Sequence, residues 1–260
     1  MHPFVALMRR YVVDYLLCQD TEICAQIMEP DYVLHMGGTD LGPRDDVYVP
    51  AVARQLAQFP GLGMTVHELV FTEDRLAMRF SQHGASVRHE GREAAWGGIG
   101  LYRWNGARLT SNYAIEDYYS RRVQLAAGVP CAVEAPAVAP WDARPGVLDI
   151  AAENAVRAWL VSATPGVGDR VIVDDAGPGN AASVLTVDET VIDELFSASG
   201  RVAFHVTQRG GYAGGLDLPE HCVGRASTLC SVGVVSRDSD GVWTGRVIRE
   251  RSALRAMLAD

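Results

Sequence analysis

The sequence predicts an α+β protein built from two tandem copies of one domain, each a curved antiparallel sheet wrapped around N-terminal helices. Residues 68–84 align without a gap to residues 194–210, and the similarity resumes further along in the same order. Helix-spaced apolar residues precede a run of alternating strands, which is the order of an α+β domain. We expect a first domain over 1–126, an Ala/Pro-rich linker over 127–145, and a second, reduced domain over 146–260 that forms a pseudo-dimer with the first.

The first copy should contain three helical segments and then a meander of strands. Asp20 can cap the second helix, and Pro50 should kink the third helix or mark its first turn. Asn105-Gly106 is a strong hairpin signal between the last two strands. The expected helices are 4–15, 20–28 and 44–59, and the expected strands are 32–36, 64–71, 75–84, 92–104 and 108–119.

The second copy begins with a helix expected over 147–161. Its last strand region, 245–258, matches 112–125 of the first copy. The interval 175–191 is shorter than the matching interval 36–65, so the mid-domain helix is expected to be trimmed or missing.

Composition and charge exclude several classes of protein. The chain has 260 residues, a net charge of −9 and a pI of about 5.2, with no run of Lys or Arg, so we expect no nucleic-acid partner. No apolar run approaches the roughly 20 residues that span a bilayer, and Arg9 and Arg10 interrupt the apolar N-terminus, so neither a membrane span nor a signal peptide is expected. Five scattered cysteines are typical of free thiols in a reducing cytoplasm.

One strand of the first copy combines glycines with aromatic residues. Glycines at 97, 98 and 100 favour a bulge or a sharp bend. Trp96, Tyr102 and Trp104 share a face of this strand, where they would line an aromatic pocket or a sheet-to-sheet interface.

An acidic residue stands where the last strand of the first copy ends. Alternation places five residues on one face: Leu109, Ser111, Tyr113, Ile115 and Asp117. If that face lines the cone-shaped cavity enclosed by the sheet, desolvation raises the pKa of Asp117 toward neutrality and suits it to proton transfer. The alternative is a strand-end carboxylate paired with Arg121 or Arg122.

Three segments of the first copy, YVLH (32–35), FPGLGMTVHELVFTEDRLAMRFSQHG (59–84) and GIGLYRWNGARLTSNYAIED (98–117), resemble the SnoaL-like polyketide cyclases of the NTF2-like superfamily. Tyr113 stands where that family usually has Trp, four residues before Asp117. The likeness covers nearly all of the first copy and is weaker over the second. It implies the cone fold, Asp117 as the general acid/base, and a polar residue at position 35 that reaches the cavity.

The candidate site residues follow from this face and from the resemblance. We expect Asp117 to move the proton, with His35 and Tyr113 orienting or stabilising an enolate oxygen. His35 can equally be a structural histidine. No metal is expected, because the sequence has no HxH or HExxH spacing and no paired cysteines. The expected substrate-binding residues are Tyr15, Met36, Phe59, Trp96 and Ile115.

Together with the resemblance, which implies the polyketide-like substrate, these features favour a cytoplasmic, cofactor-free enzyme of secondary metabolism, such as antibiotic biosynthesis. It would cyclise or isomerise a polyketide-like or polycyclic hydrophobic molecule. A rival is epoxide opening, for which Asp40 and Glu68 are the available second acids beside Asp117. Another rival is a non-catalytic small-molecule-binding or accessory protein. The second copy is expected to be structural, although Asp175 and Glu250 could form a carboxylate pair of their own. The pseudo-dimer could also pair again as a homodimer.

Overall fold

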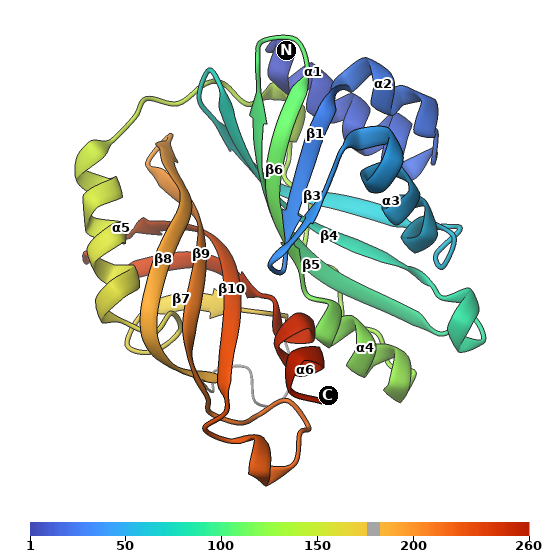
Figure 1. The fold of residues 1–260 in the computed structure, drawn as a ribbon. Coiled ribbons are helices and arrows are strands. Elements are labelled where there is room, and N and C mark those ends of the chain that lie inside the picture. The colour runs from blue at the N-terminus through green and yellow to red at the C-terminus, as the bar shows by residue number, and fades with distance from the viewer. Residues whose placement is uncertain (176–182, 260) are drawn as a thin grey trace.

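Two β-sheets stand side by side in the computed structural model, and each carries helices on the side away from the other sheet (Figure 1). The structure describes residues 1–175 and 183–259. The N-terminal helices cover the first sheet, and one long helix covers the second.

The helices of the first copy pack on the concave side of its sheet. The apolar stripe from Phe4 to Tyr15 is buried there, which confirms the first helix. The Asp20 carboxylate accepts a hydrogen bond from the Glu22 amide and so caps the second helical segment, and Pro50 lies in the first turn of α3. In chain order the helical elements are α1 (Pro3–Arg10), the π-helix η1 (Tyr11–Leu17), the 3-10 turn η2 (Thr21–Ile23), α2 (Cys24–Ile27), the π-helix η3 (Arg44–Tyr48), α3 (Val49–Leu56), the 3-10 turn η4 (Val87–His89) and α4 (Tyr118–Ala127).

The first sheet has the strand order β2-β1-β6-β5-β4-β3. Its neighbouring strands are antiparallel except β1 and β6, which run parallel, so the sheet is mixed rather than purely antiparallel. This follows from the connection, because the chain passes from β1 through β2 and a helical segment and returns beside β1 only after the whole meander. The strands are β1 (Met28–Met36), β2 (Thr39–Leu41), β3 (Gly63–Phe71), β4 (Arg75–Ala85), β5 (Glu93–Trp104) and β6 (Leu109–Glu116).

The second sheet repeats this arrangement. Its order is β7-β11-β10-β9-β8, with β7 parallel to β11, which is the order of the first sheet without β2. The duplication predicted from the sequence is therefore present in the fold. The elements are α5 (Ile150–Ser162), β7 (Arg170–Val173), β8 (Leu185–Ala198), β9 (Arg201–Tyr212), the 3-10 turn η6 (Glu220–Cys222), β10 (Ala226–Arg237), β11 (Trp243–Arg249) and α6 (Arg251–Ala259).

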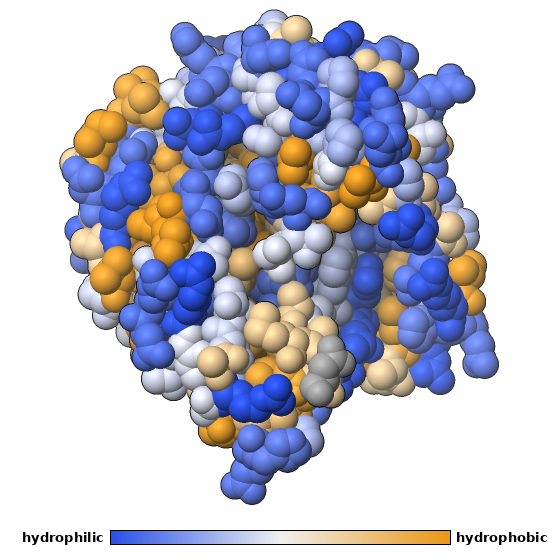
Figure 2. Space-filling view, viewed as in Figure 1, coloured by the Kyte–Doolittle hydropathy of each residue, from blue (hydrophilic) through white to orange (hydrophobic). Residues whose placement is uncertain are grey.

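The second copy differs from the prediction at its first helix. The helix begins at Ile150 rather than at residue 147, because the Asp149 carboxylate accepts a hydrogen bond from the Ala152 amide and caps it. Val147 and Leu148 stay exposed ahead of this cap, and Figure 2 shows apolar surface on the side of the molecule where α5 lies. The trimmed mid-domain interval predicted between β7 and β8 falls largely on residues 176–182, which lie outside the described residues.

The two sheets pack against each other through the faces that turn away from their own helices. One buried apolar cluster joins them. Each copy thereby covers the sheet face of the other, and the chain is a pseudo-dimer as predicted. The first copy contributes Val70, Ala77, Ile99, Leu101 and Ile115, and the second contributes Phe196, Ala198, Ala203, Cys230, Val232, Val234 and Ile248.

The segment between the copies runs along the edge strand β3. The Ala137 amide donates to the Val66 carbonyl at 2.9 Å, and the Gly146 amide donates to the Phe71 carbonyl at 2.7 Å. The only helical turn between Gly128 and Asp149 is the 3-10 turn η5 (Pro140–Asp142). These bonds use backbone groups that an open sheet edge would leave exposed.

A β-bulge in β6 decides which of its side chains face the helices. Arg103 pairs with Ser111, but Trp104 pairs with Leu109, so Thr110 is an extra residue on β6. Leu109 lies in the core beneath the helices. Past Thr110 the alternation is shifted by one residue.

The shifted alternation overturns the predicted face of this strand. Asn112, Ala114 and Glu116 point into the cone of the first copy, whereas Ile115 is buried between the two sheets and Tyr113 packs against that cluster. The prediction that Tyr113, Ile115 and Asp117 share the cavity face with Leu109 is therefore wrong.

The glycines of β5 do not form a bulge, because β5 pairs with β4 without a shift of register. Gly98 and Gly100 make room for aromatic rings instead, and Gly97 makes room for the Asp175 carboxylate. A Cβ on Gly98 would lie 2.6 Å from the Phe80 ring, and one on Gly100 would lie 2.7 Å from the Tyr102 ring.

We predict that Gly98→Ala lowers the free energy of unfolding by about 1–3 kcal/mol, because the new methyl group forces the Phe80 ring out of a packed position. Gly61→Ala is the matched control, since a Cβ there meets nothing within 4 Å. Urea unfolding of both variants checks this. Equal stability of the two variants would contradict the packing argument.

Candidate functional site

A small cavity lies inside the cone of the first copy, between the sheet and the helices. Its volume is about 80 Å³, which is room for two or three water molecules at roughly 30 Å³ each. The walls are apolar except for a polar group around Glu116. That group comprises Tyr11, Tyr48, Gln55, Gln82, Tyr102, Asn112 and Tyr118.

Glu116 is the carboxyl group of this cavity. It is the last residue of β6 and is 8% exposed, and its Oε2 accepts a hydrogen bond of 2.7 Å from Nε1 of Trp96. Burial raises the pKa of Glu116, and the Trp96 bond and the Arg121 guanidinium oppose this only in part. A carboxyl whose pKa is moved toward neutrality can both give and take a proton, which is what general acid/base catalysis requires.

The side chain of Gln82 is a second polar group in the cavity, and one of its atoms lacks a hydrogen-bond partner among the described residues. Gln82 is 3% exposed, and its Oε1 is buried with no hydrogen-bond partner in residues 1–175 and 183–259. A buried acceptor left unpaired costs roughly 1–3 kcal/mol, which a ligand with an O–H or N–H group would recover. The cavity thus combines a proton-exchanging acid with an acceptor for a ligand donor.

Asp117 lies outside this cavity, which corrects its predicted placement. It is fully buried where the two copies meet, and Nη2 of Arg251 donates to both of its carboxylate oxygens, at 2.7 and 2.6 Å. The amides of Ser120 and Asp175 also donate to it, at 3.0 and 2.9 Å, and the first of these bonds caps α4. Its oxygens are therefore occupied by a helix cap and an ion pair. The predicted alternative partners, Arg121 and Arg122, are not the ones used.

The Asp117–Arg251 pair belongs to a buried ion cluster formed by residues of both copies. Nε of Arg251 lies 3.0 Å from Oδ2 of Asp174, and Nε of Arg249 donates to the same oxygen at 2.8 Å. Burial alone would lower the pKa of Arg251, but Asp174 and Asp117 outweigh it and raise this pKa. Each carboxylate thus has a guanidinium partner, as buried charges require.

Four of the predicted substrate-binding residues lie in the first copy's core. Only Met36 lines the cavity. Tyr15 is buried in the core next to it, and Phe59 packs against Trp96 with ring centroids 5.0 Å apart. Trp96 does not line the cavity, but it donates a hydrogen bond to Glu116, which does. The fifth, Ile115, is excluded from the cavity by the bulge in β6.

His35 and Tyr113 lie together, but away from Asp117. Their rings stack with centroids 4.5 Å apart, in a pocket between the two copies. Nδ1 of His35 is 2.7 Å from Oδ1 of Asp40. Glu68 pairs with Arg201 at 2.9 Å. Neither acid proposed for epoxide opening is therefore placed beside Asp117 or in the cone cavity.

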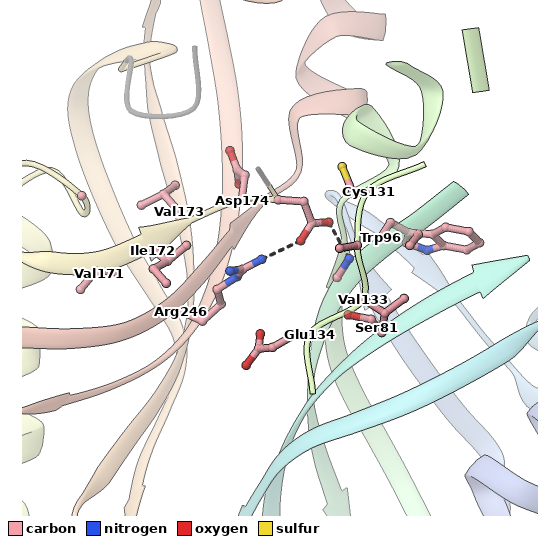
Figure 3. Close-up of a pocket in the computed structure, with 15 residues that line it drawn as sticks. Ser81, Trp96, Cys131, Val133, Glu134, Val171, Ile172, Val173, Asp174 and Arg246 are labelled. Carbon is pink, nitrogen blue, oxygen red and sulfur yellow. Dashed lines mark hydrogen bonds and ion pairs between the residues drawn. The ribbon is translucent and has the colours of Figure 1, made fainter. Parts of the chain in front are cut away.

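A larger, open cleft of about 790 Å³ separates the two copies on another side (Figure 3). Nη2 of Arg246 donates to Oδ1 of Asp175 at 2.7 Å, and the other oxygen of Asp175 accepts from the Gly97 amide at 2.6 Å. Trp96 is part of the cleft wall, but its ring points away from the cleft (Figure 3) and donates its hydrogen bond to Glu116. Glu250 instead accepts from the Ala253 amide at the start of α6, so Asp175 and Glu250 have different partners.

The described residues contain no group of three or more His, Cys, Asp or Glu side chains arranged to hold a metal ion. Within the same part of the chain, no helix combines the length and apolarity needed to cross a membrane.

The fold and the cavity define the class of protein, a tandem pair of cone-shaped α+β domains with an acid-bearing cavity in the first cone. No family model and no curated protein matches the sequence. Solved structures do match, and they include SnoaL-like polyketide cyclases, the family that the sequence resembles.

Three of these structures illustrate the likeness. A "putative SnoaL-like polyketide cyclase" from Jannaschia sp. CCS1 is 14% identical, with a TM-score of 0.45, over 49% of this chain and 96% of its own. IdmH, "a putative polyketide cyclase" from Streptomyces antibioticus, is 22% identical, with a TM-score of 0.42, over 48% and 99%. AclR, "a putative hydroxylase" from Streptomyces galilaeus, is 19% identical, with a TM-score of 0.42, over 47% and 94%. Each match spans about half of this chain and concerns its fold, not its activity.

Sequence reasoning missed Glu116, Gln82 and Arg251. Glu116 and Asp117 are neighbours, so strand alternation alone decides between them, and no residue type marks the bulge at Thr110. Arg251 is 134 residues from Asp117 in the sequence. Its pairing depends on how the two copies dock, which no local pattern reports.

Proposed function

We propose that the protein is a cofactor-independent acid/base enzyme that acts in the cone of the first copy, with Glu116 as the group that moves the proton. The observation that carries the proposal is the buried carboxyl of Glu116, which lines a mainly apolar cavity and whose pKa is raised by burial. The reaction is an isomerisation or ring closure. Glu116 as carboxylate takes a proton from a carbon next to a carbonyl, which leaves an enolate. In an isomerisation the resulting acid returns the proton to another atom of the enolate. In a ring closure the enolate carbon attacks a second carbonyl of the same molecule, and the acid gives the proton to the alkoxide oxygen that forms.

The chemistry of the walls supports an apolar substrate with a hydroxyl or enol group. The unpaired Oε1 of Gln82 accepts such a donor, and the aromatic walls suit a ring. Ligand pockets usually measure about 300–1,000 Å³, so the 80 Å³ cavity must widen before a ring enters. A polyketide-like enol, the substrate class that the family resemblance implies, has the required donor and acidic C–H groups.

Epoxide opening is less well supported than acid/base catalysis. Glu116 is the only carboxyl among the described residues that line the cavity. A second acid to position water or a hydroxyl is therefore missing from its walls.

The proposal is tested by following hydrogen exchange next to a carbonyl. Cyclohexanone, 2-cyclohexenone and 2-tetralone are incubated with the protein in D₂O, and the loss of the α-proton signals is measured by NMR. We expect faster exchange for at least one ketone, and a reduction of about 10²–10⁴-fold in Glu116→Gln. The amide keeps an acceptor for Trp96 but cannot move the proton.

Glu189→Gln is the control, because Glu189 is exposed in a surface ion pair with Arg209. It should exchange the ketones at the wild-type rate. Exchange that is equally fast in Glu116→Gln would overturn the role of Glu116. Saturable ketone binding without exchange would favour the binding-protein alternative.

A further inference from the structure

A pocket of about 200 Å³ lies where the β1–β2 hairpin of the first copy meets strands β8, β9 and β10 of the second. Figure 1 shows the hairpin reaching toward the second sheet. We call this cavity the junction pocket. The lining residues that matter for the argument are His35, Asp40, Tyr113, Asp193, His205 and Thr207.

The inner end of the junction pocket holds a histidine–carboxylate pair. Nδ1 of His205 is 2.8 Å from Oδ2 of Asp193, and Oγ1 of Thr207 donates to the same oxygen at 2.8 Å. Burial alone would raise the pKa of Asp193, but the bonds from His205 and Thr207 outweigh it and lower this pKa. Asp193 is therefore a carboxylate, and it holds the ring proton of His205 on Nδ1.

The other ring nitrogen of His205, Nε2, does not take part in this pair. Its Nε2 is buried without a hydrogen-bond partner in the described part of the chain, and the His205 side chain is only 5% exposed. With the proton on Nδ1, Nε2 presents a lone pair. A buried nitrogen of this kind is an acceptor for a ligand O–H or N–H group.

Flat rings form a wall beside this acceptor. The Tyr113 ring lies between two imidazoles, with centroids 4.5 Å from His35 and 4.8 Å from His205. At the outer end the Asp40 side chain is 71% exposed, so the pocket opens there and closes at His205. The pocket is large enough for one ring, since an apolar cavity of ~150 Å³ holds benzene.

The side chains around the junction pocket disfavour an anion or a metal ion as its ligand. Asp40 and Asp193 line it, and no Lys or Arg does so among the described residues, so an anion would be repelled. The described residues also offer no arrangement of three or more ligating side chains for a metal ion.

We propose that the junction pocket is a second ligand site, which binds a single-ring aromatic or enolic molecule whose hydroxyl group donates to Nε2 of His205. The site exists only because the two copies share one chain and present different residues to each other. The second copy has Ile172 at the strand position of His35. His35 pairs with Tyr113 in the first sheet, and Ile172 pairs with Arg246, the residue that matches Tyr113, in the second. The proposal does not depend on the function assigned to the cone.

The test compares 4-methylphenol, which stays un-ionised at pH 7, with toluene, which has the same ring and methyl group but no hydroxyl donor. Binding to the full-length protein is measured by calorimetry, and the Cε1–H signal of His205 is followed by NMR. We expect saturable binding of the phenol, roughly 10-fold or more tighter than that of toluene, because a buried acceptor gains its hydrogen bond. The His205 signal should shift with the phenol and not with toluene.

Two variants complete the test. His205→Phe should bind both compounds equally, while Glu116→Gln, which alters only the cone, should keep the preference for the phenol. Equal binding of the two compounds by the wild-type protein would overturn the proposal, and so would an unmoved His205 signal at saturation. Loss of the preference in Glu116→Gln would place the phenol in the cone and would overturn it as well.

Discussion

Arg251→Met should lower the free energy of unfolding by about 3–5 kcal/mol, the largest stability change we expect from one substitution outside the apolar core. Arg251 is 5% exposed, and its guanidinium lies against two carboxylates that are fully buried. Methionine fills a similar space but leaves Asp117 buried without its cationic partner. Asp174 is affected less, because it keeps its bonds to Arg249.

The measurement is urea unfolding at pH 7, with two comparisons that separate charge from packing. Arg209→Met removes an exposed ion pair with Glu189 and should cost less than about 1 kcal/mol. Adding Asp117→Asn to Arg251→Met should restore part of the lost free energy of unfolding, because the uncharged amide needs no cationic partner. If the double variant is no more stable than Arg251→Met alone, the cost arises from packing rather than from an unpaired carboxylate.

Glu250→Gln should stabilise the protein by about 3 kcal/mol above pH 7 and change little near pH 4.5. Burial, followed by the nearby carboxylates Asp117 and Glu116, raises the pKa of Glu250 from its ordinary value of 4.5 to about 7. At roughly 1.4 kcal/mol per pKa unit, ionising this group in the folded protein opposes folding by about 3 kcal/mol. Glutamine keeps an oxygen that can accept the bond from the Ala253 amide.

The direction of this pH dependence follows from proton binding. Because the pKa of Glu250 is higher in the folded than in the unfolded state, the folded state binds more protons between about pH 4.5 and 7. The contribution of Glu250 is therefore most favourable below pH 4.5 and is lost as the pH rises through 7. The difference in free energy of unfolding between the wild type and Glu250→Gln separates the contribution of Glu250 from those of other buried acids.

Unfolding curves at several pH values check this prediction, with Glu189→Gln as a control at an exposed position. The control should follow the wild type at every pH. A constant difference between wild type and Glu250→Gln from pH 4.5 to 8 would show that Glu250 titrates alike in both states. That result would remove the electrostatic argument for this residue.

The repeated architecture was predictable because it rests on features that local sequence carries. The apolar spacing from Phe4 to Tyr15, the cap at Asp20 and the strand runs each depend on neighbours a few residues away. The gapless match of 68–84 with 194–210 then reports the duplication directly. The parallel pairing of β1 with β6 was not predicted, since it joins strands far apart in the sequence.

The sequence analysis placed Asp117, at the end of the last strand of the first copy, in the cone, and the structure places it elsewhere. An acid at the end of β6 does line the cone, but it is Glu116 rather than Asp117. One extra residue, Thr110, reverses the alternation, and no residue type at this position marks the bulge. His35 and Tyr113 do come together, yet His205, which packs against Tyr113 on its other side, belongs to the other copy.

By itself the sequence determined the α+β class, the two copies and the helices that open them, because periodicity, caps and repeats are local properties of the chain. It did not predict the helices α4 and α6 that follow the last strand of each copy. Only the tertiary structure decided which acid enters the cone and which is clamped by Arg251. It also placed His205 against Tyr113. Burial, and with it the pKa of a carboxyl group, depends on strand register and on the docking of distant segments, and neither is written in any short stretch of residues.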